Sequence, residues 1–276
     1  MSLSQISYGQ ANSQPAPDSI QEKRQPFSEW FPDAKIGVRF GDHVSDLKKW
    51  SQILKSSGVR YIIMPSVVPE PLPIKGQLYD IRWLQEKDLI DQEVSFQESR
   101  PTIDSIPQPL GSYSLKTRVV FFSSTTTAQQ IIVALLSALS KGENLLLKID
   151  TPNDPETLKN VQYHLSNIGR WLSKKSQAIY GTRTWIKPTI SFGGKTQIFY
   201  TFNPNSSTLY AISPEWPPDP LTLFDIPISS KTKVTLLGRH GEVEWQGHNG
   251  HIQIHPPKRI QITRQFAYVF KITHIP

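Results

Sequence analysis

Four histidines near the C-terminus are candidate metal ligands. They lie close together in the sequence, at His240, His248, His251 and His255. Imidazole nitrogens bind zinc well, but a protein zinc site needs three or four ligands that converge on one point. No cysteine or patterned carboxylate accompanies these histidines. The sequence therefore favours exposed loop histidines, and we expect no metal site.

A short glycine-rich segment is a candidate for phosphate binding. Gly193-Gly194-Lys195-Thr196 is similar to the end of a phosphate-binding loop, in which backbone N–H groups and a lysine hold the phosphate. The leading glycine of such a loop is absent, and residues typical of a strand follow. A hairpin turn is the better interpretation, and we expect no bound cofactor.

Carboxylates that could act as nucleophile or general acid gather in one segment. Asp88, Asp91 and Glu93 lie within a few residues of one another, and Asp104 follows. Such groups catalyse reactions only when a fold holds them in a shared site with the right protonation state. An acidic cluster in a loop is ordinarily solvated, so we expect no catalytic residue in this segment.

The composition describes an ordinary globular chain of one or two domains, with 276 residues of which 37% are hydrophobic and 19% charged. No apolar run approaches the roughly 20 residues needed to cross a bilayer, and residues 1–25 contain no apolar stretch typical of a secretory signal. The absence of cysteine excludes disulfides and thiolate metal sites. We expect an intracellular protein without membrane contact.

The net charge of +7 comes mainly from the C-terminal third of the chain. Lys258, Arg259, Arg264 and Lys271 could form a patch that faces anions. Neither a nucleic-acid motif nor interleaved stacking aromatics accompany them. A solvated basic surface is therefore the better interpretation, and a nucleic-acid partner is not expected.

The elements that would position a site begin after a polar leader. Residues 1–26 are rich in Ser, Gln and Pro and predict a flexible leader or an extended arm. The pattern then predicts a strand at Lys35–Phe40, a helix that stops at Gly58, and a buried strand at Tyr61–Met64. This βαβ unit should have a right-handed crossover. Residues 65–116 predict an irregular, loop-dominated insert with a weak helical stretch around Leu78 to Leu89.

Two further helices flank one more strand. Thr126 or Thr127 can cap a helix that runs from Ala128 to Leu139 at helical spacing, and a buried strand is predicted at Asn144–Ile149. Asp154 as N-cap and Pro155 at the first helical position predict the next helix. Residues 27–180 therefore form an α/β part.

Residues 181–276 show short β-rich runs separated by Gly, Pro, Asn and Ser, which predicts a β-sandwich. In the last run, Phe266, Tyr268, Phe270 and Ile272 alternate and should face the core. The predicted strands are Gln197–Phe202, Leu209–Ile212, Leu221–Phe224, Lys233–Leu237, Glu242–Trp245, His251–Ile254 and Gln265–Ile272.

Several motifs resemble those of the α-L-fucosidases, glycoside hydrolase family 29. Leu139–Leu147 is similar to the family's S-K/L-G-G-N-x-L-L segment, and Ile168–Leu172 with Gln177–Trp185 is similar to its I-G-x-W-L…A-I-Y signature. Upstream, Trp30–Val38 resembles the W-F-x-x-A-K-F-G-I opening, and Trp50–Ile63 resembles the segment that follows it. The resemblance implies a β/α-type catalytic domain followed by a β-sandwich.

The α/β part is too short for a complete barrel. A (β/α)₈ barrel takes about 250 residues, and the part between Phe27 and Tyr180 is much shorter. We therefore predict the fold class as α/β plus all-β: an incomplete, barrel-derived parallel sheet followed by an antiparallel sandwich. Three strands should lie in the order Tyr61–Met64, Lys35–Phe40, Asn144–Ile149.

The positions that carry the family's chemistry differ in this chain. Retaining glycosidases use two carboxyl groups, and the resemblance implies an Asp nucleophile on a middle strand. No matching segment occurs, and Asp91 or Glu93 is the nearest relic. Val38–Gly41 stands where the family has I-H-W-G, Met64–Pro69 where it has K-H-H-x-G-F, and Lys148–Thr151 where it has N-I-G-P. Leu110–Tyr113 keeps only part of the family's S-W-G-Y loop.

These differences favour a catalytically inactive fucosidase-like protein that acts as a structural or binding module with protein partners, as a subunit of a larger intracellular assembly. Two alternatives stay open. One is an active α-L-fucosidase with a rebuilt site, and the other is a lectin-like module that binds a glycan. The residues do not identify a substrate-binding position or a partner.

Overall fold

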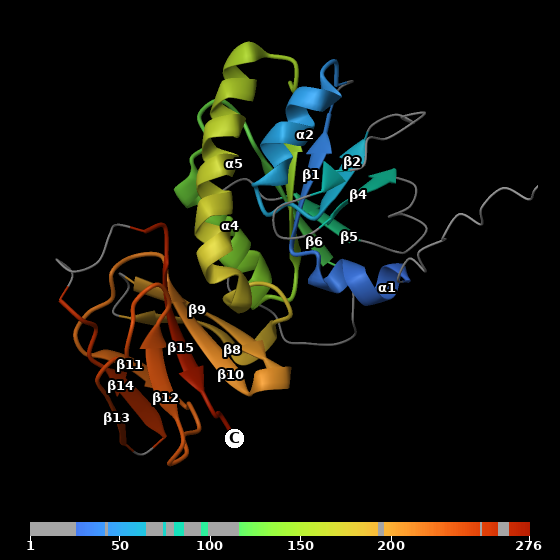
Figure 1. The fold of residues 1–276 in the computed structure, drawn as a ribbon. Helices are drawn as coiled ribbons and strands as arrows, with labels where there is room; N and C mark the ends of the chain where they lie inside the picture. Colours follow the sequence, from blue (N-terminus) through green and yellow to red (C-terminus); the bar gives the residue numbers. More distant parts are fainter. Residues whose placement is uncertain are drawn as a thin grey trace, which may run out of the picture.

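The computed structural model describes residues 26–41, 44–64, 74–75, 80–85, 95–98, 116–192, 196–248, 250–258 and 265–276. Figure 1 shows a sheet flanked by helices, followed by a second part built from strands. The predicted leader, residues 1–26, lies outside the described residues except for Pro26. No helix in the described ranges is long and apolar enough to span a membrane.

The first part contains a seven-stranded sheet in the order β3-β4-β2-β1-β7-β6-β5. Every neighbouring pair is parallel except β3 and β4, which are antiparallel. The predicted order of three strands, β2 beside β1 beside β7, is confirmed. Within the described residues the sheet is open, with β3 and β5 at its edges. The strands are β1 (Ile36–Phe40), β2 (Tyr61–Met64), β3 (Ile74–Lys75), β4 (Asp80–Gln85), β5 (Ser95–Glu98), β6 (Lys116–Phe121) and β7 (Asn144–Ile149).

The predicted helical stretch around Leu78 to Leu89 is wrong where the structure describes it. Asp80–Gln85 forms strand β4, which pairs with β2 in parallel and buries Ile81. Without β4 the backbone groups of β2 would form an open edge, and pairing in the sheet outweighs a weak local helical preference. The expected irregular insert at 65–116 contains three strands of the sheet, and β6, at its C-terminal end, was not predicted.

Side-chain caps fix where the helices begin. Thr127, rather than Thr126, caps α4 (Ala128–Ser140) and forms a capping box with Gln130. Asp154 accepts a hydrogen bond of 2.7 Å from the Thr157 backbone N–H at the start of α5 (Pro155–Lys175). Asp46 does the same for α2 (Leu47–Lys55). These three helices cover one face of the sheet with their apolar residues, among them Trp50, Ile132 and Leu165.

The opposite face of the sheet carries an aromatic cluster at the N-terminal ends of the strands. Helix α1 (Phe27–Trp30) and the 3₁₀ turn Phe31–Asp33 place Trp30 and Phe31 against Tyr61. The Tyr61 ring lies over Gly37, where a β-carbon would come within 2.2 Å of it. The aromatic rings therefore cover this face of the sheet near the N-terminal ends of its strands.

The second part is a β-sandwich, as predicted. One sheet has the order β12-β15-β10-β9-β8, and the other has the order β11-β14-β13. Ile198, Leu223 and Phe270 belong to the core between them. The strands are β8 (Arg183–Phe192), β9 (Thr196–Asn203), β10 (Thr208–Ser213), β11 (Leu221–Phe224), β12 (Lys233–Leu236), β13 (Trp245–His248), β14 (His251–Ile254) and β15 (Tyr268–Thr273).

Three details of the sandwich differ from the prediction. Strand β8 was missed because its Pro188 argues against a strand, although proline is tolerated on an edge strand such as this one. The predicted strand Glu242–Trp245 is displaced to β13, and Glu242 only bridges to Thr235. Strand β15 begins at Tyr268, so Phe266 precedes it and packs against the helical core instead of the sandwich core.

The helical core extends into the sandwich and joins the two parts. Trp171 of α5 donates from its indole Nε1 to the carbonyl oxygen of Ala267 at 3.1 Å, and Thr201 Oγ1 donates to the carbonyl oxygen of Ala178 at 2.7 Å. Phe199 and Val269 of the sandwich belong to the same cluster as the helical residues. The α/β part and the sandwich therefore pack together through the region around Trp171, as the apolar residues of this joint predict.

Candidate functional site

A row of five side chains crosses the sheet near the C-terminal ends of its strands, on the face opposite the helices. Alternate residues of a strand point to opposite faces, and Val38, Phe40, Leu147 and Ile149 are the ones that meet the helices. The side chains of the row lie on the other face and come from residues that are in register across neighbouring strands. They are Leu84, Ile63, Arg39, Lys148 and Phe121. The two cations Arg39 and Lys148 are thus direct neighbours.

Lys148 contacts both an acid and an aromatic ring. Its ammonium nitrogen lies 3.3 Å from Asp150 Oδ1 and 4.8 Å from the centroid of the Phe121 ring, which is 39% exposed. A β-carbon on Gly41 would lie 2.6 Å from the same Asp150 oxygen. The segments that leave β1 and β7 therefore approach closely, and a glycine is needed at position 41.

Neither Tyr61 nor Arg82, which lie nearer the N-terminal ends of the strands than this row, can act as a general base. Burial raises the pKa of the Tyr61 phenol well above its usual range, and the neighbouring Thr117 hydroxyl opposes that shift only in part. The phenol is consequently neutral at physiological pH. The guanidinium of Arg82 lies 4.3 Å above the Trp30 ring and is directed into the aromatic cluster.

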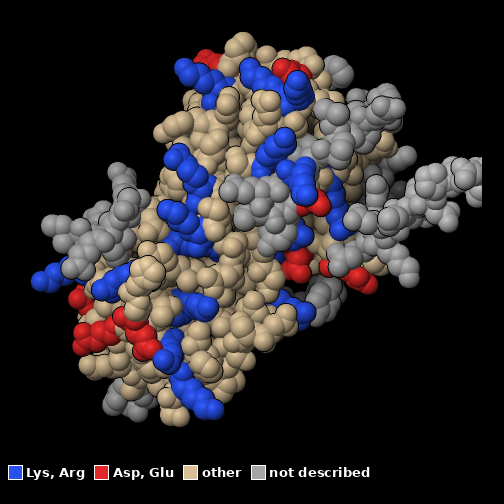
Figure 2. All heavy atoms as spheres, in the orientation of Figure 1, with Lys and Arg blue, Asp and Glu red and all other residues tan. Residues whose placement is uncertain are grey.

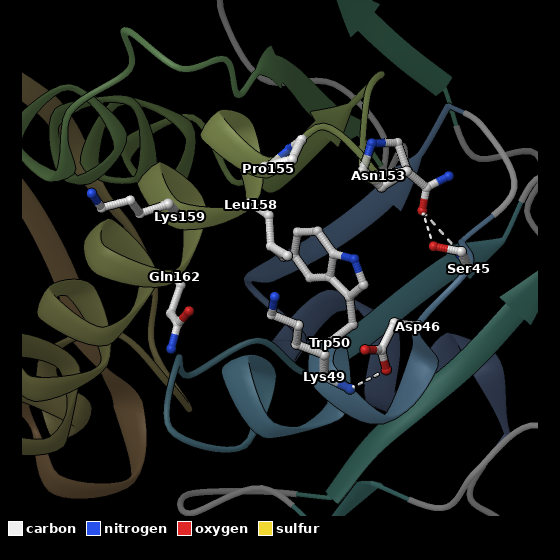
Figure 3. Close-up of a pocket in the computed structure, with 10 residues that line it drawn as sticks. Ser45, Asp46, Lys49, Trp50, Asn153, Pro155, Leu158, Lys159 and Gln162 are labelled. Carbon is white, nitrogen blue, oxygen red and sulfur yellow. Dashed lines mark hydrogen bonds between the residues drawn. The ribbon is translucent and has the colours of Figure 1, made fainter.

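A pocket of about 460 Å³ lies between the N-terminal halves of α2 and α5. Figure 3 shows Leu158 of α5 directed toward the Trp50 ring of α2, with Lys49 extending from α2 toward α5. At one end, Ser45 donates from its backbone N–H and its hydroxyl to Asn153 Oδ1, at 3.0 and 2.7 Å. The pocket is therefore polar at its rim and apolar between the helices.

Comparison with known proteins shows to which proteins this chain is similar. The model of the α-L-fucosidase C-terminal domain matches residues 194–273. Tissue α-L-fucosidase from Homo sapiens is 30% identical over 164 residues, which cover 57% of this chain and 34% of that protein. The α-L-fucosidase from Dictyostelium discoideum is 34% identical over 116 residues, which cover 42% of this chain and 24% of that protein. This chain is related to the α-L-fucosidases.

Solved structures show the same fold. The Thermotoga maritima α-fucosidase in complex with fucose matches with a TM-score of 0.63 and 13% identity, over 89% of this chain and 96% of that chain. Isoenzyme 1 from Paenibacillus thiaminolyticus matches with a TM-score of 0.65 and 12% identity, over 89% and 98%. The chain spans only about a third of the length of the human relative.

The structure describes some of the predicted site positions and not others. Arg39 and Lys148, at two of the positions that depart from the family motifs, lie side by side. Asp91, Glu93 and Asp104 lie outside the described residues, as do the segments 65–69 and 110–113. The structure therefore brings together the two altered strand ends but does not place the acidic candidates.

Two of the candidate histidines, His251 and His255, have separate side-chain contacts. His255 Nδ1 lies 2.9 Å from Asp219 Oδ1, and the His251 ring packs at 4.8 Å against the Phe224 ring. The described ranges contain no group of three potential metal ligands. Residues 193–195 lie outside the description, but β8 and β9 pair antiparallel up to Phe192 and Thr196, as a hairpin requires.

Sequence reasoning missed Phe121, the Lys148–Asp150 pair and the pocket between α2 and α5. The β7 motif gave a signal for the Lys148–Asp150 pair, because adjacent parallel strands bring their C-terminal ends together. Phe121 gave none, since it lies on β6, which was not predicted. The pocket gave no local signal, since its walls come from helices that are far apart in the sequence.

Proposed function

We propose that this fucosidase-related chain does not hydrolyse fucosides and serves as a binding or structural module with protein partners. The observation that carries the proposal is the pair Arg39 and Lys148 at neighbouring strand ends. A retaining glycosidase places two carboxyl groups about 5 Å apart at its site, around a transition state that develops positive charge. The two cations outnumber the Asp150 carboxylate that pairs with Lys148, and they therefore oppose that charge.

Two acidic residues at the C-terminal ends of described strands, Glu98 of β5 and Asp150 after β7, have backbone positions that are far apart. Glu98 is in register with Val119, which is in register with Leu146, whereas Asp150 comes four residues after Leu146. The Cα atoms of Glu98 and Asp150 are therefore two strand spacings apart across the sheet and four residues apart along the strand direction, which gives a separation of roughly 16 Å. This distance supports the proposal.

Hydrolysis of 4-nitrophenyl α-L-fucoside by the purified chain tests it. We expect no release of nitrophenol above that of the Asp150→Asn, Glu98→Gln and Asp91→Asn variants. Turnover by the native chain that one of these substitutions reduces by several orders of magnitude would contradict the proposal, because loss of a nucleophile has that effect.

A further inference from the structure

Helices α2 and α5 lie side by side and present a surface rich in cations. After its first turn neither helix contains Asp or Glu. Figure 2 shows Lys and Arg side chains gathered over this side of the molecule with few acids among them. We call this surface the basic face, and it consists of the exposed residues Lys48, Lys49, Lys55, Lys159, Arg170 and Lys174.

The lysines of the basic face are not neutralised from within. None of their five ammonium groups forms an ion pair with a residue in the described ranges, while Arg170 contacts the Asn167 side chain. Asp46 and Asp154 at the helix starts each accept a backbone N–H. Unpaired charges of one sign create a field that attracts an oppositely charged partner.

The pocket between α2 and α5 opens within the basic face. Trp50, which is 2% exposed, and Leu158 form its apolar walls, and Lys49, Lys159 and Gln162 stand at its rim. In Figure 3 the Lys49 side chain reaches toward α5, whereas Lys159 extends away along α5. The cavity has an apolar base and a rim with two lysines and one carboxylate, that of Asp46. The excess of cations at the rim matches an apolar side chain flanked by acids.

Tyr163 adds an anchor beside the pocket. It follows Lys159 by one helical turn and is 64% exposed. Tyrosine and arginine are enriched among residues that dominate the energy of protein interfaces, and Tyr163 and Arg170 occupy the same helix. Single-stranded nucleic acid would need several stacking aromatics, and Tyr163 is the sole strongly exposed aromatic residue on the described parts of these two helices.

We propose that the basic face docks an acidic segment of a partner protein, with one apolar side chain of that segment seated in the pocket that Trp50 and Leu158 line. The inference rests on the proposed binding role and specifies the chemistry of the partner. Charge complementarity supplies the attraction, and the pocket supplies the specificity.

Fluorescence anisotropy tests the docking with a short labelled peptide in which glutamates flank one phenylalanine. We expect binding that weakens as salt rises. The double variant Lys49→Glu, Lys159→Glu should raise Kd about tenfold or more, and the matched control Lys231→Glu, Lys258→Glu on the sandwich should leave Kd within about twofold. Circular dichroism checks that both variants are folded.

Three outcomes overturn the inference. They are the absence of peptide binding, equal binding of a peptide with alanine in place of phenylalanine, and tighter binding of a single-stranded oligonucleotide that the same charge reversals weaken. Fucoside hydrolysis is measured separately on the native chain, so a failure of the docking inference and a failure of the proposed non-hydrolytic role are distinguishable.

Discussion

Gly169 of α5 lies directly against the backbone of Ser56 at the end of α2. A β-carbon built on Gly169 would lie 1.5 Å from the Ser56 carbonyl oxygen. This contact sets how closely the helices approach, and the pocket lies toward their N-terminal ends. The glycine of the I-G-x-W-L motif is therefore required for helix packing rather than for chemistry.

Replacing Gly169 by alanine should destabilise the protein by about 3 kcal/mol or more, because the backbones must separate. Intrinsic helix propensity alone predicts a gain of about 1 kcal/mol, so the sign of the change separates the two effects. Urea unfolding measures it, with Ser173→Ala on the exposed side of α5 as the control. A stabilised Gly169→Ala variant would contradict the close contact.

Asn144 joins the start of β7 to the segment before β1. Its Oδ1 accepts from the Lys35 backbone N–H at 3.0 Å, and its Nδ2 donates to the Phe31 carbonyl oxygen at 2.7 Å. Asn144→Ala should lower the free energy of unfolding by about 1 to 3 kcal/mol, since it removes the acceptor of the Lys35 N–H, whereas the Phe31 carbonyl oxygen still accepts from the Ala34 N–H. An effect below about 0.5 kcal/mol in urea unfolding would show that these bonds contribute little.

Lys175 is buried at the joint between the two parts and donates to the Leu237 carbonyl oxygen. Burial lowers the pKa of Lys175 to about 8, and the nearby Lys174 charge acts in the same direction. Between this value and the usual lysine pKa the unfolded chain binds more protons than the folded one, so stability rises with pH. From about pH 8 to 9.5 the gain is on the order of 1 to 2 kcal/mol.

The Lys175→Met variant tests this origin of the pH dependence. The free energy of unfolding of this variant should rise less with pH than that of the native chain. The Lys174→Met variant, changed on the exposed surface, should show most of the native rise. Chemical denaturation across about pH 7.5 to 9.5 makes the comparison. Identical slopes for the native chain and Lys175→Met would exclude Lys175 as the titrating group.

Periodicity and capping predicted the elements whose structure is determined locally. Asp154 and Pro155 mark the start of α5, and the apolar runs at Tyr61–Met64 and Asn144–Ile149 are buried strands. Strand β4 was missed because its conformation depends on pairing with β2. The alternation in the last strand correctly places Tyr268, Phe270 and Ile272 in the sandwich core. It does not reveal that the other face of β15 is also buried, where Val269 packs against the helical core.

The site was predictable only where parallel strands bring motifs together. Arg39 and Lys148 follow from the ends of β1 and β7. The pocket between Trp50 and Leu158 depends on how two helices pack, which the spacing of residues along each helix does not specify.

Covalent trapping tests the absence of a nucleophile most directly. The purified chain is incubated with a 2-fluoro fucosyl fluoride, a reagent that forms a stable glycosyl-enzyme ester with a retaining glycosidase. The intact mass of the chain is then measured. We expect an unmodified mass. A stoichiometric fucosyl adduct that peptide mapping assigns to an Asp or Glu would contradict the proposal that this fucosidase relative is not a glycosidase.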